Sequence, residues 1–205
     1  MDDAARPQIY LVTPPEFDPA PFADTLAAVL DAHPVACLRL ALTTGDDDRQ
    51  ARAADALREV AHARDVPLVS TDRSGLAARL GLDGVHLTDG ARSVRKARKA
   101  LPADAIVGAH CGQSRHDGMT AGESGADYVA FGPVGASALE DDRAPLDLFQ
   151  WWSETIELPV VAEGRVDAEA IAALLAATDF FALGEEIWRD DDPAAALGRL
   201  IAAMG

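Results

Sequence analysis

Short, almost continuously apolar runs alternate along this chain with longer segments whose apolar residues recur every three or four positions. Runs of this length and composition are typical of parallel strands that are buried on both faces. Eight such strands are predicted, at Gln8–Thr13, Val35–Leu42, Pro67–Thr71, Gly84–Thr88, Ala105–His110, Tyr128–Val134, Pro159–Gly164 and Phe180–Gly184. The periodic segments predict eight helices, at Phe22–His33, Arg49–Ala63, Ser74–Leu80, Ser93–Leu101, Arg115–Glu123, Leu146–Ile156, Ala168–Ala177 and Pro193–Met204.

Eight strands that alternate strictly with eight helices predict an α/β fold, the (β/α)8 or TIM barrel. A doubly wound open sheet is the alternative, but eight alternating units favour closure of the sheet. Each unit takes roughly 25 residues, which is compact for a fold of about 250 residues. Because no linker or low-complexity tract interrupts the pattern, we expect a single barrel domain over residues 1–205.

The charge balance limits the partners that this chain can bind. It has 34 acidic and 18 basic residues among 205, a net charge of −16. A surface this acidic repels nucleic acid and anionic membranes, and no apolar run reaches the roughly 18 residues of a membrane span. The start of the chain lacks a signal-peptide pattern, and two distant cysteines, Cys37 and Cys111, lie in apolar stretches. We therefore expect a cytoplasmic protein with a small-molecule substrate, and a homodimer remains open.

The lysine content removes two kinds of chemistry. Lys96 and Lys99 are the only lysines, and both lie in one polar run. The Gly-rich phosphate loop that ends in Gly-Lys is absent, and neither lysine is placed for a Schiff base. In a (β/α)8 barrel the active site instead lies at the carboxyl ends of the strands. The polar residues that follow the predicted strands are therefore the candidates for chemistry.

Several of these strand ends carry a family resemblance, in the order of the predicted strands. The runs are Ile9-Tyr10-Leu11-Val12-Thr13, Leu38-Arg39-Leu40, Ser70-Thr71-Asp72-Arg73, Leu82-Asp83-Gly84-Val85-His86-Leu87 and Gly125-Ala126-Asp127-Tyr128-Val129-Ala130-Phe131-Gly132-Pro133-Val134. Through them the chain resembles the thiamine phosphate synthase family and its thiazole tautomerase relatives, over about residues 8–193. The last two runs are specific in combination and order.

The resemblance implies a reaction and a cofactor. The family synthase joins an aminopyrimidine pyrophosphate to a thiazole phosphate, with Mg²⁺, and releases pyrophosphate. Asp72 matches the family's magnesium carboxylate, although an Asp there also suits an N-cap of the next helix. Asp89 is the second candidate metal ligand. Thr71 lies beside the metal position as a substrate-binding candidate.

The second strand keeps one of the three polar groups that the family carries there. The family has Gln, Arg and Lys at alternate inward positions, and this chain has Cys37, Arg39 and Ala41. An Arg within an apolar strand is expected to be buried and paired. We therefore predict that Arg39 points into the barrel, pairs with a carboxylate or ligand, and is catalytic.

After the fifth and sixth strands the family's polar groups are largely replaced. The family pattern Gly-x-Ser-x-His corresponds to Gly108–Gly112, where only the glycine fits. The catalytic candidates in this region are His110, Ser114 and His116, and Arg115 is a substrate-binding candidate, although Ser114 also suits a helix cap. Of the family's Thr-x-Thr-Lys, one hydroxyl remains, Ser137, and the lysine position is Glu140.

The last two turns carry acid where the resemblance implies a phosphate site. The candidates there are Gly164, Arg165, Gly184 and Glu185, with Glu163 and Glu186 beside them. Carboxylates repel a phosphate, so we predict a mouth too acidic to bind a thiazole phosphate tightly without Mg²⁺, unless Glu185 turns away into a salt bridge.

Three functions remain open at this point. One is a thiamine phosphate synthase-like enzyme with a diverged phosphate site, in which ordinary coupling is either kept or impaired. The second is a binder of a heterocyclic small molecule, with altered specificity or without catalysis. The third is an isomerase that resembles the thiazole tautomerase, with His110 or His116 as the proton carrier. We predict that His86, inside a strand, is structural and bonded to backbone.

Overall fold

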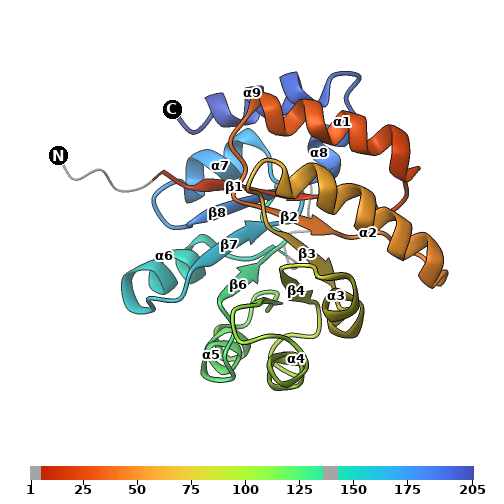
Figure 1. The fold of residues 1–205 in the computed structure, drawn as a ribbon. Helices are drawn as coiled ribbons and strands as arrows, with labels where there is room; N and C mark the ends of the chain where they lie inside the picture. Colours follow the sequence, from red (N-terminus) through yellow and green to blue (C-terminus); the bar gives the residue numbers. More distant parts are fainter. Residues whose placement is uncertain (1–5, 136–142) are drawn as a thin grey trace.

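A computed structural model describes residues 6–135 and 143–205. Eight parallel strands close into a barrel in sequence order, with β8 paired to β1 (Figure 1). The strands are β1 Gln8–Val12, β2 Cys37–Leu40, β3 Leu68–Thr71, β4 Gly84–Leu87, β5 Ile106–His110, β6 Tyr128–Phe131, β7 Val160–Glu163 and β8 Phe180–Leu183. The predicted (β/α)8 barrel is confirmed, and the open-sheet alternative is wrong because β1 and β8 are hydrogen-bonded.

Helices surround the barrel as the periodic segments predict. They are α1 Pro19–Ala32, α2 Asp47–His62, α3 Ser74–Leu80, α4 Val94–Ala100, α5 Arg115–Glu123, α6 Leu146–Thr155, α7 Ala168–Leu174, α8 Glu185–Trp188 and α9 Pro193–Ala202. Two differences from the prediction have a clear physical reason. Helix α2 begins earlier because the Asp46 side chain accepts hydrogen bonds from the N–H groups of Asp48 and Arg49. Helix α8 was not predicted, since four residues are too few to show a helical period.

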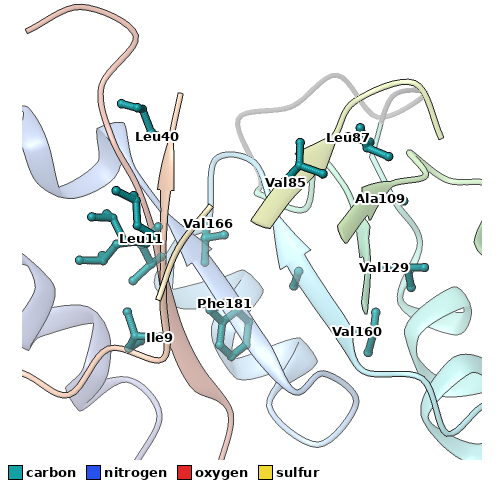
Figure 2. Packing of buried hydrophobic residues seen from close by; sticks show 14 of the residues in the cluster. Ile9, Leu11, Leu40, Val85, Leu87, Ala109, Val129, Val160, Val166 and Phe181 are labelled. Carbon is teal, nitrogen blue, oxygen red and sulfur yellow. The ribbon is translucent and has the colours of Figure 1, made fainter. Parts of the chain in front are cut away.

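Alternation along the strands separates two cores. On β1, Ile9 and Leu11 pack outward against the helices, in the large apolar layer of Figure 2. Tyr10 faces the barrel interior, where it joins a smaller cluster with Cys37 and Tyr128. The same period of two applies to every strand. It therefore determines which side chains reach the barrel axis.

None of the helices in the described part of the chain is long and apolar enough to cross a membrane.

Close packing of the strands gives the first testable prediction. A Cβ atom on Gly84 would lie 1.9 Å from the backbone oxygen of Ile106 on the neighbouring strand, and a backbone atom cannot move aside. Gly84→Ala should therefore lower the free energy of unfolding by roughly 1–3 kcal/mol. Gly45→Ala, where a Cβ atom meets nothing within 4 Å, is the control and should change it by less than about 0.5 kcal/mol. Urea unfolding of both variants measures the difference, and equal effects would contradict it.

Candidate active site

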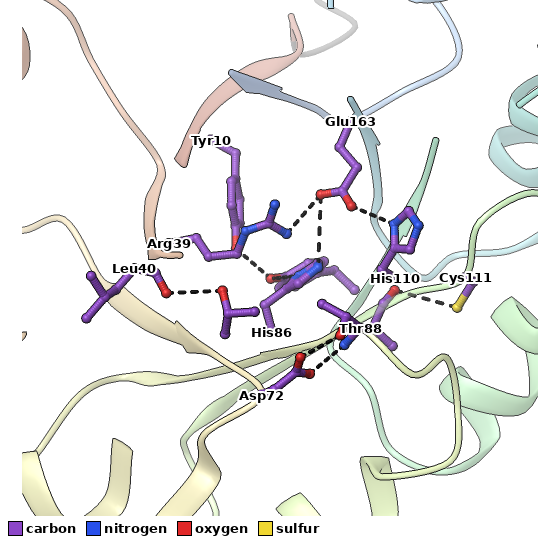
Figure 3. Close-up of polar contacts among 12 residues, drawn as sticks. Tyr10, Arg39, Leu40, Asp72, His86, Thr88, His110, Cys111 and Glu163 are labelled. Atoms are coloured by element: carbon purple, nitrogen blue, oxygen red, sulfur yellow. Dashed lines mark hydrogen bonds and ion pairs between the residues drawn. The ribbon is translucent and has the colours of Figure 1, made fainter. Parts of the chain in front are cut away.

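Polar side chains from six strands converge inside the barrel, and two of them, His110 and Glu163, are the last residues of their strands. The side chains come from β1, β2, β4, β5, β6 and β7, and most are drawn in Figure 3. All occupy inward positions of the two-residue strand period. The group, called the inner cluster below, consists of Tyr10, Arg39, His86, His110, Tyr128 and Glu163.

Arg39 and Glu163 form the ion pair at the centre of the inner cluster. Nη1 of Arg39 donates a hydrogen bond to Oε2 of Glu163 at 2.9 Å, and each side chain is 13% exposed. Burial raises the pKa of Glu163, but Arg39 and the neighbouring histidines outweigh burial and hold that pKa far below its usual range. The predicted inward position and carboxylate pairing of Arg39 are thus confirmed. Its positive charge is already neutralised by the chain itself.

His110 lies between this buried carboxylate and the solvent. Its Nδ1 atom is 2.5 Å from Oε1 of Glu163, close enough for an ion pair whenever the imidazole is protonated. The imidazole also lines an open cavity of about 500 Å³ at the ends of β4 and β5. The other lining residues are Thr88, Asp89, Gly90, Ala91, Arg92, Cys111, Gly112, His116, Asp117 and Thr120. One imidazole therefore touches both a buried anion and the space in which a ligand fits.

Three residues of the inner cluster, His86, Tyr128 and Tyr10, form an uncharged hydrogen-bonded chain. Nδ1 of His86 lies 2.9 Å from the Tyr128 hydroxyl, which lies 2.8 Å from the Tyr10 hydroxyl. Burial lowers the pKa of His86 well below its usual range and raises the pKa of both tyrosines. Nε2 of His86 is 4.0 Å from Glu163 and lacks a hydrogen-bond partner. The backbone partner predicted for His86 is wrong, because a tyrosine hydroxyl takes that place.

Asp72 joins two strand ends. Its carboxylate accepts hydrogen bonds from the backbone N–H of Thr88 at 2.7 Å and from the Thr88 hydroxyl at 2.5 Å. The alternative of an N-cap is wrong, because helix α3 starts after Arg73 without a side-chain cap. Asp72 therefore ties the end of β3 to the end of β4.

The other two candidates beside Asp72 also have partners within the chain. Oδ2 of Asp89 accepts a hydrogen bond from the Ser93 hydroxyl at 2.6 Å. The Thr71 hydroxyl donates to the Leu40 carbonyl at 3.1 Å. Of the two, only Asp89 lines the cavity.

A magnesium ion at the mouth would need Asp72 and Asp89. Oxygen ligands suit Mg²⁺, which commonly takes one or two carboxylates together with substrate phosphates. Both oxygens of Asp72 already accept from Thr88, however. Within residues 6–135 and 143–205, three or more acidic, His or Cys side chains nowhere gather into a metal-binding group. The described residues therefore do not form by themselves a metal site of three such side chains.

Two candidates at the start of α5 are used structurally. The Ser114 hydroxyl accepts from the N–H of Asp117 at 3.1 Å, so it caps the helix as the capping alternative predicts. Arg115 contacts Asp147 at 3.1 Å, and its guanidinium carbon lies 4.9 Å from the centre of the Trp151 ring. These contacts place the charge of Arg115 against α6.

Of the remaining candidates of this region, one lines the cavity and two lie outside the residues that the structure describes. His116 lines the cavity. Ser137 and Glu140 lie outside the described residues. His116 therefore accompanies His110 at the cavity, whereas the match to the family's Thr-x-Thr-Lys stays a prediction.

Side chains of the last two βα turns form contacts within the chain, to backbone N–H groups or to a neighbouring arginine. Gly164 and Arg165 both have positive φ, at 85° and 56°. Glu185 pairs with Arg189 four residues later, which is the salt bridge predicted as its alternative. Glu186 turns back instead, and its carboxylate accepts hydrogen bonds from two backbone N–H groups of these turns.

Sequence reasoning did not identify Glu163, Tyr10 or Tyr128 as site residues, and it treated Glu163 only as excess acid near the seventh turn. The available signal was its place at the end of the apolar run Pro159–Ala162, where an inward charge needs a partner. Arg39 had the same signal on β2. Two opposite charges at inward positions of buried strands each indicate the need for a partner.

Comparison with known proteins identifies the family. Residues 9–187 match the family model described as thiamine monophosphate synthase. The chain is 45% identical to the thiamine-phosphate synthase of Rhodospirillum centenum, over 93% of this chain and 94% of that one. It is 37% identical to that of Erythrobacter litoralis, over 92% and 91%.

A solved structure supports the fold. Thiamine phosphate pyrophosphorylase from Pyrococcus furiosus superposes with a TM-score of 0.82 over 96% of this chain and 95% of that one, at 20% identity. At this identity the likeness shows the barrel alone, while the sequence matches show descent. The chain therefore belongs to the thiamine monophosphate synthase family and is a thiamine phosphate synthase-like protein.

Proposed function

We propose that this protein binds a small aromatic heterocycle at the barrel mouth and isomerises it by proton transfer through His110 and Glu163. The observation that carries the proposal is the contact of 2.5 Å between Nδ1 of His110 and the buried Glu163 carboxylate, beside an open cavity. An imidazole is suited to this role because it takes up and releases a proton near neutral pH. The family resemblance supports a heterocycle as the ligand class.

The proposed step needs no co-reactant. Nε2 of His110 removes a proton from a saturated carbon attached to the conjugated ring of the ligand, and the C–H electron pair moves into the conjugated system. The same proton, or one from solvent, then returns at a second position, so that atoms and charge balance. Burial opposes the charge on Glu163, but Arg39 lowers its pKa enough to keep it ionised, and that charge stabilises the imidazolium that forms. Glu163 is a positioning residue, since it acts through His110.

The same geometry disfavours displacement of pyrophosphate. That chemistry needs cations placed around the departing anion. On β2 only Arg39 is cationic, and Glu163 neutralises it. Arg73 and Arg115 each pair with an exposed aspartate instead. The cavity itself is lined by one arginine, Arg92, and two aspartates, Asp89 and Asp117, so the charges of the described residues favour an uncharged or cationic ligand over a leaving pyrophosphate.

The family's coupling reaction is the second candidate. The 45% identity to a thiamine-phosphate synthase favours it, and Arg39 and Asp72 match the family pattern. In that case Mg²⁺ would be the cofactor, and Asp72 and Asp89 are the carboxylates that would hold it. We place either reaction in the cytoplasm, in line with two buried cysteines that form no disulfide, and include a homodimer in the proposal.

Solvent exchange tests the proposed isomerisation. The full chain is incubated in D₂O with the thiazole alcohol, the thiazole phosphate or the aminopyrimidine alcohol, and ¹H NMR follows each C–H signal. We expect at least one compound to exchange 100-fold faster than without protein, within the range that a positioned acid–base group supplies. His62→Gln, which changes a half-exposed histidine on α2, is the control and should keep the full exchange rate. Exchange at the uncatalysed rate for all three compounds would contradict the proposal.

A further inference from the structure

The His86 imidazole is held in one orientation inside the barrel. It is 1% exposed, and its Nδ1 atom lies 2.9 Å from the Tyr128 hydroxyl. The Tyr128 ring stacks on the imidazole, with the ring centres 5.8 Å apart and the planes 26° from parallel. Because a buried ring with these contacts cannot turn freely, the direction of its other nitrogen is also fixed. That nitrogen, Nε2, faces the Glu163 carboxylate at 4.0 Å (Figure 3).

A glycine on β5 leaves the space for this stacked pair. The strand register places His86 of β4 beside Gly108, and Gly108 beside Tyr128 of β6. A Cβ atom on Gly108 would lie 2.0 Å from Cζ of the Tyr128 ring and 2.3 Å from its hydroxyl oxygen. The tyrosine therefore crosses the inner face of β5, at a position where any other residue would place its side chain, to reach the histidine on β4.

The two oxygens of Glu163 face different partners. Oε2 accepts from Arg39 at 2.9 Å and is the oxygen that His86 faces at 4.0 Å. Oε1 lies 2.5 Å from Nδ1 of His110. Since a carboxylate is planar, groups that hold one of its oxygens also set the direction of the other. Arg39 and His86 on Oε2 thus leave Oε1 directed at His110.

The charge on Glu163 selects one tautomer of His86. Burial lowers the pKa of His86 well below its usual range, so the ring carries a single proton at neutral pH. A proton on Nε2 faces the carboxylate, whereas a lone pair there would face a negative charge. Nδ1 then accepts from the Tyr128 hydroxyl, whose oxygen accepts from the Tyr10 hydroxyl in turn. In this arrangement the O–H and N–H donors all point from Tyr10 toward Glu163.

We infer that His86 is a positioning residue that, with its proton on Nε2, holds the Glu163 carboxylate so that Oε1 stays directed at His110. The inference rests on the proposed function in one respect: it adds a residue on which proton transfer by His110 depends. His86 is not among the described residues that line the cavity, so it acts through Glu163. The orientation of Glu163 is a property of the protein without ligand, so it can be measured separately from any reaction.

Nitrogen NMR of the ligand-free full chain is the first test. The ¹⁵N signals of an imidazole show which of its nitrogens carries the proton, and we expect Nε2 for His86. The side-chain amide of glutamine reaches about as far as Nε2, whereas that of asparagine reaches only as far as Nδ1. The Nδ1 signal of His110, assigned with His110→Gln, should therefore stay in place in His86→Gln and move in His86→Asn.

The D₂O exchange assay is the second test, and it uses the heterocycle that the unchanged protein exchanges. His86→Asn should exchange it about 5–10-fold more slowly and His86→Gln within about twofold of the full rate, a difference typical of residues in one hydrogen-bonded network. The concentration for half-maximal exchange should stay the same in both, because His86 does not line the cavity. His33→Gln is the control and should keep the full rate, since His33 bonds to the Ala194 carbonyl, in the loop before α9.

Two results would overturn the inference: a proton on Nδ1 of His86 in the unchanged protein, and equal behaviour of the Asn and Gln variants. Equal behaviour would make His86 a structural residue only. If the unchanged protein exchanges no heterocycle, the proposed function fails, but the His110 signal in the two variants still decides whether His86 orients Glu163. If the variants do not fold, the spectrum of the unchanged protein decides: a proton on Nε2 of His86 supports the inference, and a proton on Nδ1 contradicts it.

Discussion

Arg39→Met is expected to lower the free energy of unfolding by about 3–5 kcal/mol at pH 7, the usual cost of leaving one charge of a buried pair without its partner. Methionine fills a similar volume, so the loss reports the charge. Glu163 then remains ionised, or takes up a proton, in a site where its side chain is 13% exposed. Urea unfolding measures the loss. Arg73→Met is the matched control, because its partner Asp47 is exposed, and it should cost less than about 1 kcal/mol.

The pH dependence of the stability loss in Arg39→Met gives a second test of this ion pair. In the unchanged protein the folded-state pKa of Glu163 is lowered, so its contribution is present above the unfolded pKa of about 4.3 and is lost as pH falls toward the folded value. In Arg39→Met the attraction is gone while burial still raises the pKa of Glu163. The difference in stability between the two proteins should therefore shrink from pH 7 to pH 4. A constant difference across that range would contradict the ion-pair explanation.

A double variant completes the test. Arg39→Met with Glu163→Leu removes both charges and leaves an apolar pair, which commonly costs little or stabilises a protein. It should recover most of the stability that Arg39→Met loses. If the double variant is as unstable as the single one, Arg39 stabilises the barrel by packing and not through Glu163.

His110→Ala is expected to slow the proposed proton exchange by about 100-fold, to the rate without protein, which lies within the usual contribution of a positioned general base. The affinity for the heterocycle should change little, because many other residues line the cavity. The ¹H exchange assay and a binding titration measure the two quantities separately. Glu163→Gln should slow exchange less, since it removes only the charge beside the imidazole. Equal exchange rates in His110→Ala and the unchanged protein would remove His110 as the base.

The relation between His110 and Glu163 can be read from a double variant. If Glu163 acts through His110, then Glu163→Gln should slow exchange clearly in the unchanged protein and hardly at all in His110→Ala. Additive effects would show that the two residues act independently. They would then remove Glu163 from its positioning role while leaving His110 as the candidate base.

Periodicity predicted the barrel because it is a local property of the chain. Each of the eight buried runs predicts a strand from its own residues, and each of the eight amphipathic segments predicts a helix. The barrel fold follows from their alternation. Helix α8 escaped this reasoning because four residues span about one turn. The boundaries of β2 were predicted too wide, since Val35 and Leu42 lie outside the strand but pack against the same apolar core.

The site was only partly predictable because its contacts are distant in sequence. The inward position of Arg39 followed from its apolar neighbours, but its partner Glu163 lies 124 positions away. Likewise, Tyr10 and Tyr128 meet across 118 positions. A local pattern can place each of these side chains on the inner face of a strand, but only closure of the barrel brings the strands together.

Glu185 and Glu186 show the same limit at the last turn. The sequence Glu185-Glu186 does not indicate which of the two carboxylates bonds to backbone. A salt bridge of Glu185 was predicted only as one alternative. The folded backbone at the end of β8 directs Glu185 to Arg189 and Glu186 to the N–H of Gly184. Which of two adjacent carboxylates bonds to the backbone N–H groups of these turns therefore depends on the turn that carries them.

The most direct test of the central claim, that this family barrel transfers protons and does not displace pyrophosphate, is one NMR experiment on the unchanged protein. The full chain is mixed in D₂O with the aminopyrimidine pyrophosphate, the thiazole phosphate, the thiazole alcohol and Mg²⁺. ¹H spectra follow exchange at the heterocycle carbons while ³¹P spectra follow release of pyrophosphate. The account predicts rapid exchange, with pyrophosphate released no faster than without protein. Rapid release of pyrophosphate together with formation of thiamine phosphate, without exchange, would contradict it.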